Sequence, residues 1–139
     1  NIVISDTVGF IRDLPHSLVD AFHATLEVAT HADLLLHVVD SASHARDEQI
    51  EEVNKVLREI GADRVGQLIA WNKIDLTEAQ PGIERDEYGN IARVRVSART
   101  GEGLDLLRES LAEYARAKAE ARQKAIAEAE FEAQHDYIN

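Results

Sequence analysis

The sequence predicts an α/β fold with a mostly parallel sheet and a long C-terminal helix, and three observations support this class. Apolar segments of strand length alternate with segments of helical spacing, which is the order typical of α/β proteins. The run from Ala32 to Val39 is mostly apolar, as expected for a strand covered on both faces. Leucines at helical spacing begin a helix at Leu104, and the alanine-rich stretch from Ala115 to Ala133 continues it.

The first half of the chain is expected to contain two strands, each followed by a helix. Asn1 to Ser5 has three consecutive apolar residues and is interpreted as the end of a buried strand. After a loop, Ser17 to Thr30 carries apolar residues on one helical face. The strand at 32–39 follows, and Arg46 to Ile60 again has helical spacing. Gly61 occupies the position where a glycine commonly ends a helix.

The second half is expected to add two more strands before the long helix. Gln67 to Trp71 has the pattern of a buried strand, and Arg93 to Val96 alternates like a strand with one less protected face. Between them, Asp75 to Arg85 is expected to be a loop with a short helix, interrupted by Pro81 and Gly82. Residues 86–90 have the composition of a turn.

Composition excludes several classes of function. The chain has 139 residues, of which 45% are hydrophobic and 29% charged, which suits one soluble domain with a single core. It contains no cysteine, which excludes a disulfide scaffold and a thiol nucleophile. The net charge of -11 disfavours sequence-independent nucleic-acid binding. No segment has the length and apolarity of a transmembrane helix. Because the chain contains no methionine, either its N-terminus was removed or it is part of a longer protein.

Polar residues follow three of the predicted strands, and ligands in open α/β sheets bind at the carboxyl ends of strands. The three segments are therefore expected to converge on one ligand. They are Asp6-Thr7-Val8-Gly9, Asn72-Lys73-Ile74-Asp75 and Ser97-Ala98-Arg99-Thr100-Gly101.

These residue types suit a guanine nucleotide with magnesium. The carboxylate of Asp75 would accept two hydrogen bonds from the N1–H and exocyclic amine of guanine, a donor pair that adenine lacks. The stem of Lys73 would lie along the purine ring, and the N–H of Ala98 would approach the guanine carbonyl. Asp6 would bind magnesium through water, and Gly9 would bring its N–H close to a terminal phosphate.

The three segments in this order resemble the GTPase superfamily of P-loop proteins. The stretch from Asp6 to Asp40, with Phe10, Leu14-Pro15 and Ala32-Asp33-Leu34-Leu35-Leu36-His37-Val38-Val39-Asp40, further resembles the HflX family of ribosome-associated GTPases. The resemblance implies the P-loop GTPase-type three-layer fold. The matched part would be a partial GTPase domain, 1–114, and the alanine-rich composition of the rest predicts a helical tail or linker, 115–139.

The resemblance implies a cytoplasmic, monomeric enzyme that hydrolyses GTP with Mg²⁺. Its partners would be GTP or GDP and the large ribosomal subunit, both rRNA and protein, and it would split or rescue ribosomes. Carried over by position, Gly9 and Phe10 belong to the catalytic region and Asp6 to the metal site. The nucleotide-binding residues would be Asp6, Thr7, Val8, Gly9, Asn72, Lys73, Ile74, Asp75, Ser97, Ala98 and Arg99.

Two departures from the superfamily pattern affect the expected activity. The phosphate loop G-x-x-x-x-G-K-[ST] and the first switch are absent, so the fold is expected to lack the phosphate-loop strand. The isolated chain is therefore expected to be inactive. Phe10 stands where many GTPases carry a glutamine or histidine that orients the attacking water. Its side chain has no donor or acceptor, so another group must position this water.

Other interpretations remain open. The chain could come from a GTPase of ribosome assembly or tRNA modification, or it could be a non-catalytic fragment or binding module. A phosphate-loop motif encoded just upstream of Asn1 would favour the HflX hypothesis, and a start codon there would favour the last one. Arginines 12, 93, 95 and 99 could contact RNA, although solvated side chains are the simpler interpretation. The six histidines show no metal-ligand spacing.

Overall fold

The expected alternation of strands and helices is present in the computed structural model, which describes residue 4 and residues 27–136. The expected strand at the N-terminus and most of the helix expected at 17–30 lie outside this part, although residues 27–30 are helical. The elements are β1 (Leu35–Asp40), α2 (Arg46–Glu59), β2 (Gln67–Asn72), the short 3-10 helix η1 (Ile74–Leu76), β3 (Gly82–Arg85), β4 (Ile91–Arg95) and α3 (Leu104–Asp136).

The four described strands form one sheet in the order β1-β2-β4-β3. β2 pairs with β1 and β4 in parallel, and β3 pairs with β4 in antiparallel orientation, so the sheet is mostly parallel, as predicted. The register places Asp40 of β1 beside Asn72 of β2. Because parallel strands point the same way, the carboxyl ends of β1, β2 and β4 lie at one edge of the sheet.

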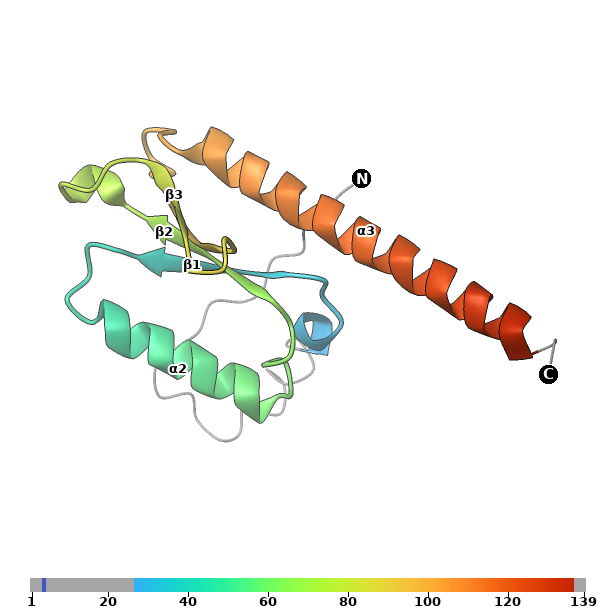
Figure 1. Ribbon diagram of the computed structural model, residues 1–139. Coiled ribbons are helices and arrows are strands. Elements are labelled where there is room, and N and C mark those ends of the chain that lie inside the picture. Colours follow the sequence, from blue (N-terminus) through green and yellow to red (C-terminus); the bar gives the residue numbers. More distant parts are fainter. Residues whose placement is uncertain (1–3, 5–26, 137–139) are drawn as a thin grey trace.

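Helices cover the two faces of the sheet, with α2 on one side and α3 on the other (Figure 1). On the α2 side, buried Leu57 packs with Ala29 and Ala62. On the α3 side, the buried cluster contains Val94 and other strand residues, and the first leucines of α3 pack against it. Consecutive strand residues point to opposite faces, which explains why the sheet builds two separate clusters. The expected three-layer arrangement is confirmed.

A glycine ends α2, as the sequence predicts. The N–H of Gly61 donates to the carbonyl of Arg58 at 3.2 Å, and the N–H of Ala62 donates to that of Leu57 at 2.8 Å. These two bonds form a Schellman motif, which needs a residue with positive φ after the helix. Gly61 supplies it with a φ of 76°. Leu57 and Ala62 also share the buried cluster on this side, so the motif fixes where the chain turns toward β2.

The connection between β2 and β4 differs from the expected loop, because it contains the strand β3 in addition to η1. The chain first forms β3 at the sheet edge and then returns through the turn at 86–90, so that β4 inserts beside β2. Asp86 Oδ1 accepts hydrogen bonds from the N–H groups of Tyr88 and Asn90, which stabilises this turn. The sequence prediction of a loop throughout 75–85 was therefore wrong at its end.

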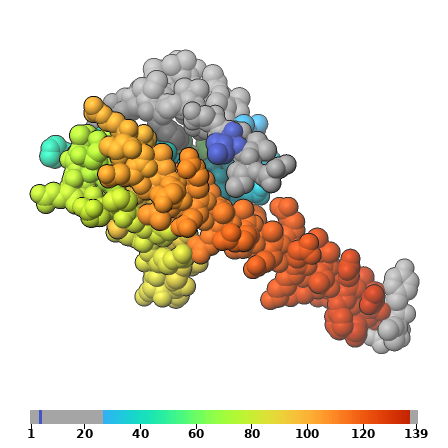
Figure 2. All heavy atoms as spheres, turned by 90° about the horizontal axis from the view of Figure 1, so that it is seen from above, coloured from blue at the N-terminus to red at the C-terminus, as the bar shows by residue number. Residues whose placement is uncertain are grey.

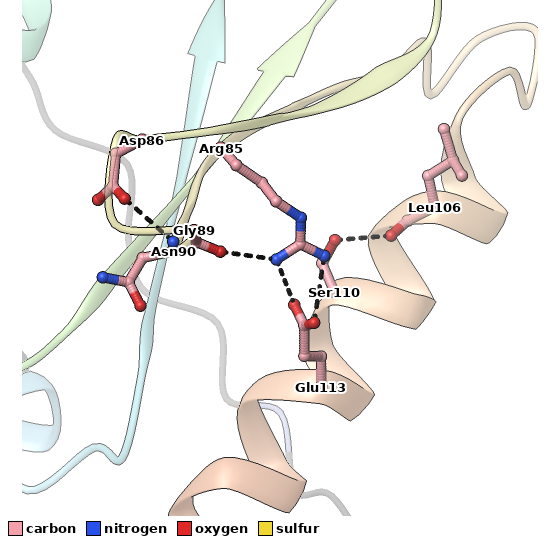
Figure 3. A network of polar contacts seen from close by, with 7 residues as sticks. All are labelled: Arg85, Asp86, Gly89, Asn90, Leu106, Ser110 and Glu113. Atoms are coloured by element: carbon pink, nitrogen blue, oxygen red, sulfur yellow. Dashed lines mark hydrogen bonds and ion pairs between the residues drawn. The ribbon is translucent and has the colours of Figure 1, made fainter.

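A two-pronged ion pair joins this hairpin to α3 (Figure 3). The guanidinium of Arg85 contacts both carboxylate oxygens of Glu113, at 3.2 and 3.1 Å, and also donates to the carbonyl of Gly89 at 2.9 Å. Ser110, one turn earlier on the same helix, is buried, and its hydroxyl donates to the carbonyl of Leu106. Planar two-pronged pairing fixes direction as well as distance, so Arg85 orients the hairpin on the helix.

The long helix α3 has two parts with different surroundings. Up to Tyr114 it packs on the sheet, and the Tyr114 hydroxyl donates to the carbonyl of Asp33 at 3.1 Å. From Ala115 to Asp136 every residue is exposed, and this part projects away from the sheet (Figures 1 and 2). None of the described helices is long and apolar enough to cross a membrane.

Candidate nucleotide-binding site

Polar side chains from the ends of three parallel strands meet at one edge of the sheet. Asp40 is the last residue of β1, and Asn72 is the last residue of β2. Ser97 and Ala98 follow β4, after Val96 extends the ladder by donating to the carbonyl of Trp71 at 2.9 Å. The sheet topology therefore brings together two of the three segments that the sequence singled out.

Two hydrogen bonds connect the loop after β2 with the loop after β4. The Ser97 hydroxyl donates to Asp75 Oδ1 at 2.8 Å, and the N–H of Ala98 donates to Asn72 Oδ1 at 3.0 Å. Ser97 is fully buried, whereas Asp75 and Ala98 are exposed. A buried hydroxyl thus holds a carboxylate whose remaining surface faces outward.

The N–H of Ala98 has a different partner from the one expected from sequence. It was expected to be open toward a ligand carbonyl, and it instead contacts the side chain of Asn72. The bond closes the two loops on each other. A ligand carbonyl at this place would have to share the N–H of Ala98 with the Asn72 amide oxygen or displace it.

Lys73 lies between Asn72 and Asp75 and makes a contact that the sequence analysis missed. Its ammonium donates to Asp40 Oδ2 at 2.9 Å, so the end of β1 also takes part in the cluster. This hydrogen bond from Lys73 is the main cause that lowers the pKa of Asp40 below its ordinary value. Both side chains are more than one-third exposed, which places the pair at the surface of the cluster.

The remaining predicted residues of these loops differ in their surroundings. Ile74 is buried, and its N–H donates to the carbonyl of Val96 at 3.3 Å, which anchors η1 on the end of β4. The Ser97 hydroxyl also accepts a hydrogen bond from the N–H of Thr100 at 3.2 Å. Arg99 is exposed, and no contact joins it to the cluster among the described residues. Asp6, Thr7, Val8, Gly9 and Phe10 lie outside the described part of the chain.

Two further residues shape the site without having been predicted. Asp40 ends an apolar run at a strand terminus, the same signal that marked the other segments, so its position could have been noticed. Gly103 is buried with a φ of 79°, and a Cβ there would run into the carbonyl oxygen of Arg95 and the backbone of Val96. Only the folded chain reveals this close approach, which lets α3 start directly beside the end of β4.

The other candidate groups do not assemble into a second site. Among residue 4 and residues 27–136, no group of three His, Cys, Asp or Glu side chains is placed to hold a metal ion. Arg93 and Arg95 both contact Glu84, at 2.6 and 2.7 Å. The guanidinium of Arg93 also lies 4.4 Å from the ring of Trp71. These two arginines are thus engaged within the sheet, whereas Arg99 is exposed.

Comparison with known proteins defines the class first. Residues 1–73 match the family model described as 50S ribosome-binding GTPase. The crystal structures of two mutation variants of SsGBP have TM-scores of 0.64 and 0.62 to this chain, at 31% and 29% identity. They cover 78% and 80% of this chain, which in turn covers 42% and 41% of theirs.

Curated relatives give the particular family. GTPase HflX of Escherichia coli is 51% identical over 112 residues, and GTPase HflX of Caldanaerobacter subterraneus is 48% identical over 111 residues. These matches cover 80% and 79% of this chain but 26% and 24% of the relatives, so the chain spans about a quarter of their length. A chloroplastic GTP-binding protein of Arabidopsis thaliana is 47% identical over 90 residues, which cover 63% of this chain and 14% of that protein. The chain belongs to the HflX family of GTPases.

Proposed function

We propose that this chain carries the guanine-recognition part of an HflX-type GTPase. The observation that carries the proposal is the pair of bonds between the two loops, Ser97 to Asp75 and Ala98 to Asn72. A carboxylate held by one oxygen keeps its other oxygen for a neighbouring donor. The N1–H and 2-amino groups of guanine form the donor pair that such a carboxylate accepts, and adenine presents no such pair.

The remaining nucleotide contacts are proposed from the family pattern. Asp6, Thr7, Val8 and Gly9 would form the second switch, with Gly9 and Phe10 beside the terminal phosphate. Asp6 would hold Mg²⁺ through water, and the bound ion would neutralise developing phosphate charge. Asp6 lies outside the described residues, and among those residues no group of three His, Cys, Asp or Glu side chains is placed to hold the ion instead. Phe10 has no polar group that could position the attacking water. The resemblance to the HflX family further implies slow intrinsic hydrolysis that the ribosome stimulates.

At the level of the whole protein, we propose binding to the large ribosomal subunit and the splitting or rescue of ribosomes in the cytoplasm. The description of the matching family, 50S ribosome-binding GTPase, supports the ribosome-binding part of this proposal. The splitting or rescue of ribosomes and the cytoplasmic location are proposed from the resemblance to the HflX family. Residues 1–114 would form the partial GTPase domain, and 115–139 a helical tail or linker. The 139 residues contain no G-x-x-x-x-G-K-[ST] motif, so on their own they would not bind GTP tightly or hydrolyse it.

A titration of the isolated chain tests the base site. We expect millimolar GDP, but not ADP, to shift the amide NMR signals of Asp75 and Ala98, while calorimetry detects no micromolar affinity. In Asp75→Asn, the amide would donate to the 2-oxo group of xanthine, so the shifts should move from GDP to xanthosine diphosphate. Loss of charge-assisted bonds to guanine should weaken GDP binding roughly tenfold or more.

Asp63→Asn is the matched control, because Asp63 is exposed and lies in the connection between α2 and β2. It should bind GDP like the unmodified chain. Equal shifts with ADP and GDP would contradict guanine recognition by Asp75. Micromolar GTP affinity of the isolated chain would contradict the proposal that it lacks essential phosphate contacts.

A further inference from the structure

The distal part of α3 is a helix with no packing partner among the described residues. Every residue from Ala115 to Asp136 is exposed, including two large apolar side chains, Ile126 at 51% and Phe131 at 62%. Most helices in proteins gain stability by packing one side against a partner. This surface is therefore suited to a partner.

Charge is segregated along this part of the helix. Residues 116–124 contain four cationic side chains and one anionic side chain, Glu120. Residues 128–136 contain four anionic side chains and no lysine or arginine. Ile126 lies midway between the two blocks. The cationic residues are Arg116, Lys118, Arg122 and Lys124, and the anionic residues are Glu128, Glu130, Glu132 and Asp136.

We propose that the distal parts of α3 from two copies of this chain pair in antiparallel orientation about Ile126. Antiparallel pairing places the cationic block of each helix beside the anionic block of the other, whereas parallel pairing places like charges together. It also sets the two helix dipoles in opposite directions. The arrangement is isologous, because the same surface serves both copies. The proposed pair differs from the monomer that the family resemblance implies.

Contacts within one copy leave these charges available. Lys124 Nζ lies 4.0 Å from Glu128 Oε1 within the helix, and Lys118 Nζ lies 3.7 Å from Asp33 Oδ1. All four side chains are largely or nearly half exposed, and exposed pairs of this kind contribute about 0–1 kcal/mol. Exchange of such weak contacts for partners on a second helix costs little.

Small side chains line the face around Ile126. The residues on this face are spaced alternately four and three positions apart in the sequence, which is the spacing of a helix–helix seam. Alanines at most of these positions allow two helix backbones to approach closely. Phe131 lies on a different side of the helix and is not part of the seam. The seam consists of Ala115, Ala119, Arg122, Ile126, Ala129 and Ala133.

Cysteine cross-linking in the full chain tests both pairing and direction, because the native sequence has no cysteine. Antiparallel pairing about residue 126 brings the two copies of that residue together, so Ile126→Cys should form a disulfide-linked dimer under mild oxidation. Ala133→Cys should not, since about 1.5 Å of rise per residue separates its two copies by roughly 20 Å. Phe131→Cys controls for exposed thiols away from the seam.

Charge reversal provides an independent measurement that does not depend on thiols. Sedimentation should give twice the monomer mass for the unmodified chain, with a dissociation constant that rises about tenfold or more at high salt. Glu128→Lys with Glu130→Lys and Glu132→Lys should give a monomer, and so should Arg116→Glu with Arg122→Glu and Lys124→Glu. A mixture of these two variants should restore the dimer.

Three outcomes would overturn the proposal. The first is a monomeric mass for the unmodified chain at several hundred micromolar. The second is efficient cross-linking through Ala133→Cys, which would indicate a parallel pair. The third is a dimer that persists in each charge-reversed variant alone, which would place the interface elsewhere.

Discussion

Lys73 adopts a backbone conformation that is uncommon for a side chain of its size. Its φ is 69°, and it is the one non-glycine residue with positive φ in the described part of the chain. The left-handed region costs an L-residue about 1–2 kcal/mol. The ion pair with Asp40 and the burial of neighbouring Ile74 oppose this cost. Such retained strain is typical of functional sites, in agreement with the role proposed for this loop.

His37 should make the stability of the fold depend on pH. Its Nδ1 is buried without a hydrogen-bond partner among the described residues, and burial lowers its pKa below the ordinary 6.5. The unfolded chain therefore binds a proton more readily than the folded chain. We expect the free energy of unfolding to be highest above about pH 6.5 and to fall as the pH decreases below this value, because protonation of His37 then favours the unfolded chain.

Urea unfolding at several pH values measures this effect. In His37→Gln the dependence between pH 5 and 7 should be smaller than in the unmodified chain. His44→Gln replaces an exposed histidine and should retain the original dependence. If His37→Gln retains the full dependence, His37 is not the titrating group.

At the scale of elements, regular patterns could be interpreted from sequence, and contacts between distant segments could not. Helix α2 begins at Arg46 as predicted, and α3 runs through the alanine-rich stretch. Strand β3 was missed because Gly82–Arg85 is short and follows a proline, which locally indicates a loop. In the site, the strand-end signal found Asn72 and Ser97, but the partners that hold them depend on the register of the sheet.

The glycine at the end of α2 should be one of the sensitive positions of this element. Nothing lies within 4 Å of a Cβ added at Gly61, so substitution changes only the backbone conformational energy at its φ of 76°. Gly61→Ala should lower the free energy of unfolding by about 1 kcal/mol, measured by urea denaturation. Gly61→Asn should cost less, because asparagine tolerates this region. Equal decreases in the free energy of unfolding in both variants would indicate that packing of the new side chain, and not the φ of residue 61, causes the loss.

At the scale of the whole molecule, β1 leaves an exposed apolar margin at one side of the described sheet. Val38 is 60% exposed and Leu36 is 40% exposed, and β1 pairs with only one described strand. Apolar edge strands favour pairing with other chains. The apolar run at 32–39 was expected to be covered on both faces, and this expectation is not met at Leu36 and Val38 among the described residues.

A charge on this margin should reduce aggregation. We expect Val38→Lys to slow aggregation several-fold at 37 °C, measured by light scattering, with little change in the urea midpoint, because the position is exposed. Ala92→Lys adds the same charge at an exposed position of β4, which is not an edge strand, and controls for net charge. An equal effect of both variants would assign the benefit to overall charge.

The two-pronged ion pair between Arg85 and Glu113 joins the two ends of the segment that carries Ser97 and Ala98. Arg85 lies in the hairpin, and Glu113 lies in the helix that extends outward. A force that bends or pulls the outer part of α3 would therefore act first on the part of the helix held by this ion pair. This part belongs to the same segment as the residues proposed to hold the base. Whatever engages the far end of α3 would therefore have a mechanical route to the residues proposed to hold the base.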